Sequence, residues 1–197
     1  MSTKDEDEQK EQVKSWAGKN SLERHVQAGL HGPPQLKKEE RRQFLGQFRE
    51  RILKALTFAQ VAEKGTYPEI RAALQDIRAE RLVISRRADL SAAGEYIRLA
   101  RKNGLSFTTV DSPRYEGDIG LVVASGTAVD EENILVPSRR ERLLAKGLPP
   151  ELIDAAEEKI CPSCLRLLRE IAPEELPNYR PLTFLDRILN RPCSSCS

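Results

Sequence analysis

The first regular hydrophobic pattern in the chain runs from about 37 to 61, where apolar side chains recur every fourth position. Phe44, Phe48, Ile52 and Leu56 form this series. Side chains three or four residues apart share one face of an α-helix, and an apolar face is normally buried. The pattern therefore predicts one long amphipathic helix.

Beyond this segment the pattern changes to short strands that alternate with helices. Residues 82–84, 106–110 and 119–124 have the composition of strands, and the last run is apolar at nearly every position, as in a strand buried on both faces. Helices are predicted at about 68–79 and 91–102, the second ending at an Asn-Gly pair. This alternation predicts an α/β fold with a helix-covered mixed sheet.

The chain divides into three predicted parts. Residues 1–20 are polar and unpatterned, which is typical of a disordered tail. Residues 21–136 hold the α/β pattern and open with a short helix at about 21–30. Residues 137–197 contain helical segments of about two turns each, which are marginally stable alone and need something that holds them together. These segments are 138–146, 150–159, 165–171 and 182–189.

Composition excludes several classes of protein. The 197 residues are 39% hydrophobic and 5% aromatic, with a net charge of +2. No apolar run approaches the ~20 residues of a membrane helix, and the N-terminal residues lack the apolar stretch of a secretory signal. We therefore expect a cytoplasmic protein with no membrane partner. The middle of the chain, residues 37–115, is basic and can attract phosphate, although alternating charges there also fit solvated helix faces.

Four cysteines lie in the last part of the chain as two C-x-x-C pairs. Cys161 and Cys164 form CPSC, Cys193 and Cys196 form CSSC, and 28 residues separate the pairs. Two such pairs present four thiolates that can converge on a tetrahedral zinc ion, although the spacer exceeds the usual 15–20 residues. The pattern predicts one structural Zn²⁺ ion with four protein ligands and no open position for water.

Thiol redox chemistry is the alternative function for the CPSC pair. The sequence LRLLREI that follows is helical, and a helix N-terminus lowers the pKa of the first thiol. Redox motifs of this kind normally follow a buried strand, whereas residues 157–160 are predicted to continue a helix. Ordinary reduced cysteines are the third interpretation, and the missing secretory signal argues against structural disulfides.

One stretch of the sequence resembles a known family. GPPQLKKEERRQFLGQFRERILKALTFAQV at 32–61, followed by YPEI and later by DIGLVVA, is similar to the YueI-like family of uncharacterised proteins in low-GC Gram-positive bacteria. The resemblance covers about 20–135 and leaves the cysteines outside. It implies a sandwich akin to the chorismate-mutase type, a fold group that includes the kink-turn-binding ribosomal proteins.

These features together predict a binding or regulatory protein, with structured RNA as the leading partner. Arginines near helix and strand ends can contact RNA phosphates. In the ribosomal proteins a turn at a helix start grips RNA; its counterpart here, 65–71, keeps a glycine and has an arginine but lacks the Asn and Glu. An adaptor whose C-terminal part binds a protein partner is the alternative. The candidate phosphate-binding residues are Arg71, Arg78, Arg86 and Arg87.

Catalytic residues are not indicated by any motif. GDIG at 117–120 and ASGTA at 124–128 lack the spacing of a phosphate-binding glycine loop. Asp118 and the acids at 130–132 are candidates for acid–base chemistry, but a solvated acidic loop is the simpler interpretation. The sequence therefore names no catalytic residue, and whether the protein is an enzyme stays open with a lean towards none.

Overall fold

The computed structural model describes most of the chain from residue 38 onwards and parts of the segment before it. The described residues are 10, 11, 13–23, 26, 38–111, 115–189 and 192–196. Residues 21–23 are helical, and the rest of the helix predicted at 21–30 lies largely outside the described residues. Within the described parts, no helix is both long and apolar enough to cross a membrane.

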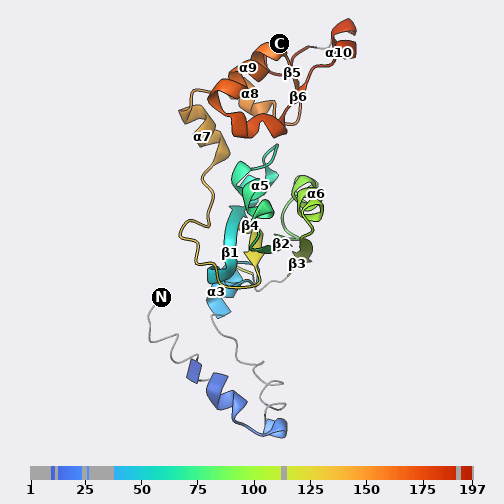
Figure 1. Cartoon of the computed structure of the whole chain (residues 1–197). Helices are drawn as coiled ribbons and strands as arrows, with labels where there is room; N and C mark the ends of the chain where they lie inside the picture. Colours follow the sequence, from blue (N-terminus) through green and yellow to red (C-terminus); the bar gives the residue numbers. More distant parts are fainter. Residues whose placement is uncertain are drawn as a thin grey trace.

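A four-stranded mixed sheet forms the centre of the N-terminal unit, which we call the α/β domain (Figure 1). Its strand order is β1-β4-β2-β3; β4 is antiparallel to β1 and to β2, whereas β2 and β3 are parallel. The predicted mixed α/β class is confirmed, and the likeness to the chorismate-mutase type stays a prediction. The strands are β1 (Ile52–Thr57), β2 (Ala79–Ser85), β3 (Ser106–Val110) and β4 (Ile119–Ser125).

The two faces of the sheet are covered differently. Helices α5 (Pro68–Gln75) and α6 (Gly94–Lys102) pack on one face, where Tyr67 and Tyr96 are fully buried. The other face packs against a turn at Leu45 and against extended chain around residue 134. A short helix, α4 (Phe58–Ala62), follows β1 directly.

The long helix predicted over 37–61 is wrong. Helix α3 (Lys38–Gln43) ends at a turn in which Leu45 and Gly46 have φ angles of 51° and 85°, and the 3-10 turn η1 (Arg49–Arg51) leads into β1. Strand β1 is buried on both faces, so it carries apolar side chains at consecutive positions. Such a run also satisfies a spacing of four, which explains why the pattern suggested a helix.

We call the described residues that follow, 137–189 and 192–196, the C-terminal module. Its buried apolar side chains cluster among themselves, between residues 143 and 193. The helix predicted at 150–159 is shorter than expected, because residues 159–160 form a strand instead. The elements are α7 (Arg139–Ala145), α8 (Pro150–Asp154), β5 (Lys159–Ile160), α9 (Pro162–Ile171), η2 (Pro173–Asn178), β6 (Arg180–Pro181) and α10 (Phe184–Ile188).

Candidate metal centre

The four cysteines predicted to bind metal lie together in the C-terminal module. Their sulfur atoms are all within 4.8 Å of one another, although 28 residues separate the two pairs in the sequence. Among the described residues, this is the cluster of three or more Cys, His, Asp or Glu side chains with the geometry of a metal site. The structure therefore brings both C-x-x-C pairs to one point.

Local structure positions each pair. Cys161 precedes α9 as its N-cap residue, and Cys164 lies in the first turn of that helix. Cys193 and Cys196 belong to a turn that reaches back to the same place, where the N–H of Cys161 donates to the Cys193 sulfur at 3.3 Å. The spacer between the pairs consists of α9, η2, β6 and α10, and its fold closes the distance.

The sulfur–sulfur distances fit a metal-bound arrangement. Cys161 and Cys196 are 3.7 Å apart at sulfur, and Cys164 and Cys193 are 3.9 Å apart. A tetrahedron with zinc–sulfur bonds of about 2.3 Å has sulfur–sulfur edges of roughly 3.8 Å. A disulfide would bring the sulfurs to about 2.05 Å, and none of these four cysteines is in a disulfide.

The thiols differ in their tendency to ionise. The backbone N–H of Cys164 is the main cause of a lowered pKa at Cys161. Burial opposes ionisation of Cys193, but the N–H groups of Ser195 and Cys161 outweigh it and lower the pKa to about 6. Burial raises the pKa of Cys164, and a hydrogen bond with Cys193 is the main cause of a pKa of about 12 at Cys196. Backbone N–H groups therefore lower the pKa of one thiol in each pair, Cys161 and Cys193.

Two further contacts tie strand β5 to α10 and to the second cysteine pair. The Lys159 ammonium lies 2.7 Å from a carboxylate oxygen of Asp186, which links β5 to α10. The hydrogen bond from Lys159 is the main cause of the strongly lowered pKa of Asp186. The N–H of Ser194 donates to the Lys159 carbonyl at 3.3 Å, so the second cysteine pair is tied to the strand that precedes the first.

The structure corrects one argument against redox chemistry. Residues 159–160 were predicted to continue a helix, but they form β5, and Cys161 stands between this strand and the N-terminus of α9. Strand followed by C-x-x-C followed by helix is the local arrangement of thiol-redox motifs. The redox alternative therefore has more local support than the sequence suggested.

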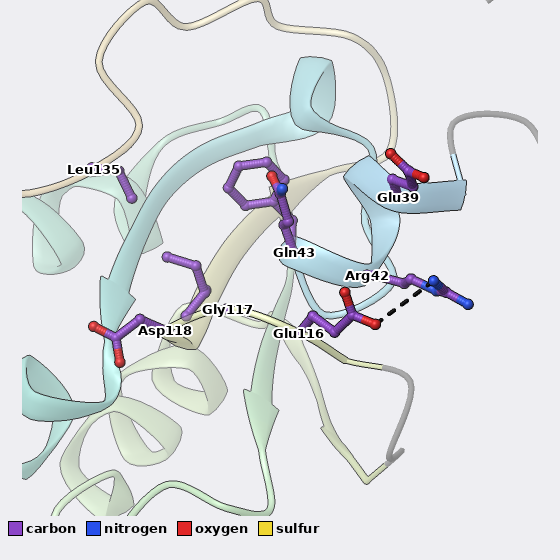
Figure 2. A pocket seen from close by; sticks show the side chains of 9 residues that line it. Glu39, Arg42, Gln43, Glu116, Gly117, Asp118 and Leu135 are labelled. Atoms are coloured by element: carbon purple, nitrogen blue, oxygen red, sulfur yellow. Dashed lines mark ion pairs between the residues drawn. The ribbon is translucent and has the colours of Figure 1, made fainter. Parts of the chain in front are cut away.

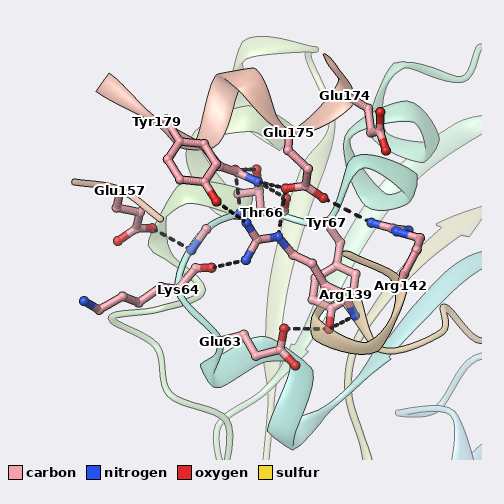
Figure 3. Close-up of polar contacts among 12 residues, drawn as sticks. Glu63, Lys64, Thr66, Tyr67, Arg139, Arg142, Glu157, Glu174, Glu175 and Tyr179 are labelled. Atoms are coloured by element: carbon pink, nitrogen blue, oxygen red, sulfur yellow. Dashed lines mark hydrogen bonds and ion pairs between the residues drawn. The ribbon is translucent and has the colours of Figure 1, made fainter. Parts of the chain in front are cut away.

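The C-terminal module contacts the α/β domain at the turn before α5 (Figure 3). The carboxamide of Asn178 accepts from the N–H of Thr66 at 2.8 Å and donates to the Thr66 carbonyl, also at 2.8 Å. The N–H of Gly65 donates to the Glu157 carboxylate at 3.2 Å. Gly65 has a φ of +85°, and a Cβ there would lie 3.1 Å from the Asn178 side chain, so glycine is required both for the backbone and for this close approach.

The structure gives the four arginines predicted to bind phosphate different surroundings. Arg71 faces the C-terminal module, where its guanidinium donates to Asn178 at 3.1 Å and to the carbonyl of Glu174. Burial lowers the pKa of Arg71. Arg78 forms ion pairs with Asp76 and Glu131. Arg86 and Arg87 are neighbours on the surface at the end of β2.

A hollow of about 520 Å³ lies at the other end of the α/β domain, beside α3 (Figure 2). Asp118 lines it, as does the Arg42–Glu116 ion pair at 3.7 Å. Of the acids considered for catalysis, Glu131 instead pairs with Arg78 at 2.9 Å. Among the described residues, its lining consists of carboxylates, apolar side chains, Gly117, Arg42 and Gln43.

Comparison with known proteins places the α/β domain in a family. A family described as "Protein of unknown function (DUF1694)" matches residues 19–135. The uncharacterized protein YueI of Bacillus subtilis (strain 168) is 31% identical over 117 residues, which are 59% of this chain and 89% of YueI. The crystal structure of the YueI protein from Bacillus subtilis matches with a TM-score of 0.50 at 30% identity, covering 61% of this chain and 94% of that one.

The chain therefore belongs to the DUF1694 family, and over the same region it is similar to YueI. The predicted YueI-like resemblance is confirmed. The family match ends at residue 135, so it includes none of the four cysteines. What the cysteine centre does must therefore be argued from this chain alone.

Proposed function

We propose that the C-terminal module carries one structural zinc ion, bound by Cys161, Cys164, Cys193 and Cys196, and that it is a metal-stapled accessory to a YueI-like binding domain. The single observation that supports this proposal is the convergence of four cysteine sulfurs, none of them in a disulfide, within 4.8 Å. Zinc supplies the cross-link that short helices and two-residue strands lack.

The four sulfur ligands limit which metal ions the site can bind. Four thiolates in a tetrahedral arrangement suit Zn²⁺ or iron–sulfur chemistry, whereas Mg²⁺ and Ca²⁺ require oxygen ligands. Four protein ligands leave no site for a reactive water, so the role of the ion is structural.

Competition for zinc tests this assignment. The protein is titrated against a chromophoric chelator, and we compare wild type with Cys164→Ser and with Ser163→Ala. Ser163 is exposed and lies between the first two ligands, so its variant is the matched control. We expect one tight site in wild type and in Ser163→Ala, and at least a tenfold loss of affinity in Cys164→Ser. Equal affinities in all three proteins would overturn the proposal.

Thiol redox chemistry is the second candidate, favoured by the position of Cys161 between β5 and α9. In that case Cys161 attacks a disulfide of a substrate, and Cys164 then displaces the reduced substrate thiol and leaves a Cys161–Cys164 disulfide. The metal-free chain is mixed with a small disulfide reagent. Reduction of the reagent by wild type, and no reduction by Cys161→Ser, would support this function. A chain that keeps zinc in the presence of the reagent and does not reduce it would exclude this function.

Structured RNA is the partner that we propose for the α/β domain. Arg86 and Arg87 support it, because both are exposed side by side, and Arg87 lies 5.1 Å from the Phe58 ring centroid, which holds its guanidinium at the surface. We expect RNA to copurify at low salt and to be released as salt rises, and the double variant Arg86→Ala/Arg87→Ala to carry less. Arg98→Ala is the control, since Arg98 pairs with Glu95 elsewhere on the surface. Nucleic-acid-free wild type would contradict this partner and favour a protein partner.

A further inference from the structure

The ribbon of β5 and β6 has the cysteine centre at one end and the contact with the α/β domain at the other. The strands are parallel, so both begin at the same end. At their start the N–H of Glu157 donates to the Asn178 carbonyl at 2.6 Å. At their far end the N–H of Leu182 donates to the Ile160 carbonyl at 3.0 Å, and Cys161 follows directly.

The ribbon depends on the cysteine centre for its order. Each strand has two residues, far fewer than an independently stable strand needs. The turn of the second cysteine pair stabilises β5 from outside, since the N–H of Ser194 donates to the Lys159 carbonyl. That turn is held in place by the convergence of Cys193 and Cys196 on the first pair. A cation bound by the four cysteines would therefore cross-link the turn that contacts β5.

The other end of the ribbon covers a group of hydrogen-bond donors on the α/β domain. The Asn178 side-chain oxygen accepts from the Thr66 N–H and hydroxyl, both at 2.8 Å, and from the Arg71 guanidinium at 3.1 Å. The Gly65 N–H donates to Glu157 at 3.2 Å. In these four hydrogen bonds the acceptors come from the C-terminal module and the donors from the α/β domain, whereas the Asn178 amide donates in return to the Thr66 carbonyl at 2.8 Å. Undocking the module therefore exposes these donors to solvent or to another acceptor.

We propose that metal binding at the four cysteines and docking of the C-terminal module on Gly65, Thr66 and Arg71 are coupled through the β5–β6 ribbon. This inference rests on the proposed zinc site and names its regulatory role. The module then covers the hydrogen-bond donors of Gly65, Thr66 and Arg71 on the α/β domain when metal is bound. Coupling between two sites is reciprocal: if metal strengthens docking by some factor, docking strengthens metal affinity by the same factor.

Hydrogen exchange on the full chain tests the coupling from the metal side. The amides of Gly65 and Thr66 are followed in the zinc-loaded chain and after zinc is removed with a chelator. We expect both to lose protection on removal. The neighbouring amide of Tyr67 is the internal control, because it donates at 2.9 Å to the Tyr96 hydroxyl within the α/β domain and should stay protected. Equal protection of Gly65 and Thr66 in both states would overturn the coupling.

A substitution tests the same coupling from the docking side. Asn178→Ala removes the shared acceptor without touching a cysteine, and Asn103→Ala, at the end of α6 in the α/β domain, is the matched control. We expect Asn178→Ala to weaken zinc binding by about 5-fold or more, within the usual range of coupling between sites, and Asn103→Ala to leave it unchanged. Unchanged zinc affinity in a folded Asn178→Ala chain would overturn the inference. A wild type that binds no zinc would overturn the proposed function as well, so the two failures are distinguishable.

Discussion

Arg139 and Glu175 form an ion pair that is almost completely shielded from solvent. The distance from Arg139 Nε to Glu175 Oε2 is 2.8 Å, and the two side chains are 3% and 0% exposed. Burial opposes the charge on Arg139, but the attraction of Glu175 and their hydrogen bond prevail and raise the pKa of Arg139. The pair joins α7 to η2 in the C-terminal module, and Arg139 also donates to the Lys64 carbonyl of the α/β domain at 3.2 Å.

Replacement of Arg139 by methionine should strongly destabilise the module. A buried carboxylate left without its partner costs about 3–5 kcal/mol, and here Glu175 would keep one further cation, Arg142, at 3.1 Å. We therefore expect a loss at the lower end of that range, measured by urea unfolding. Arg140→Met is the matched control, because Arg140 pairs with Asp154 at the exposed surface and such pairs contribute about 0–1 kcal/mol. Similar losses in both variants would contradict the assigned role of the buried pair.

Gly120 in β4 marks a close approach of backbone to α4. A Cβ at Gly120 would lie 3.1 Å from the Cα and from a ring carbon of Phe58. Gly120→Ala should therefore force the strand and helix apart and destabilise the α/β domain by about 1–3 kcal/mol. At Gly94, the first residue of α6, an added Cβ meets nothing within 4 Å. Thermal unfolding should show Gly94→Ala to be neutral or stabilising by up to about 1 kcal/mol, and a loss there equal to that of Gly120→Ala would refute the packing argument.

The Asp76–Arg78 contact predicts a pH dependence in the α/β domain. Side-chain hydrogen bonds from Arg78 lower the pKa of Asp76 from 3.8 to about 2. A carboxyl whose pKa is lower in the folded state stabilises it above the unfolded pKa, and this contribution is lost as pH falls from about 4 to 2. Both side chains are partly exposed, so screening limits the effect to about 1 kcal/mol or less.

The variant Asp76→Asn isolates this contribution. The difference in unfolding free energy between wild type and variant should favour wild type at pH 7 and shrink as pH falls from about 4 through 2. Loss of metal at low pH affects both proteins alike, so it cancels in the difference. A difference that stays constant between pH 7 and pH 2 would show that ionised Asp76 contributes nothing.

Much of the α/β domain follows from local sequence. Strands β2, β3 and β4 and the two helices that cover them were predicted close to their observed positions, because each is bounded by turn residues such as the Asn103-Gly104 end of α6. Strand β1 was not, because a strand buried on both faces and an amphipathic helix can show the same spacing over six residues. Only its antiparallel pairing with β4, a contact distant in sequence, decides between them.

The candidate metal centre, too, is predictable from the sequence only in part. The spacing of the four cysteines was enough to predict that they converge, since C-x-x-C pairs present thiols in a fixed local geometry. Strands β5 and β6 have two residues each and carry no periodic signal, so they were missed. The contact of Asn178 with Thr66 spans 112 residues and joins polar side chains that resemble ordinary surface residues in the sequence. Gly65 is the sequence signal for this contact, because its φ of +85° and the close approach of Asn178 both require glycine.

Native mass spectrometry of the full chain tests most directly whether the four cysteines bind one metal ion. The protein is purified without chelator or added metal and sprayed under non-denaturing conditions. We predict one zinc ion per chain, lost on acidification as the thiolates are protonated. A metal-free chain whose mass is lower by the two hydrogens of each disulfide formed would contradict the account and make the cysteines a thiol-redox centre.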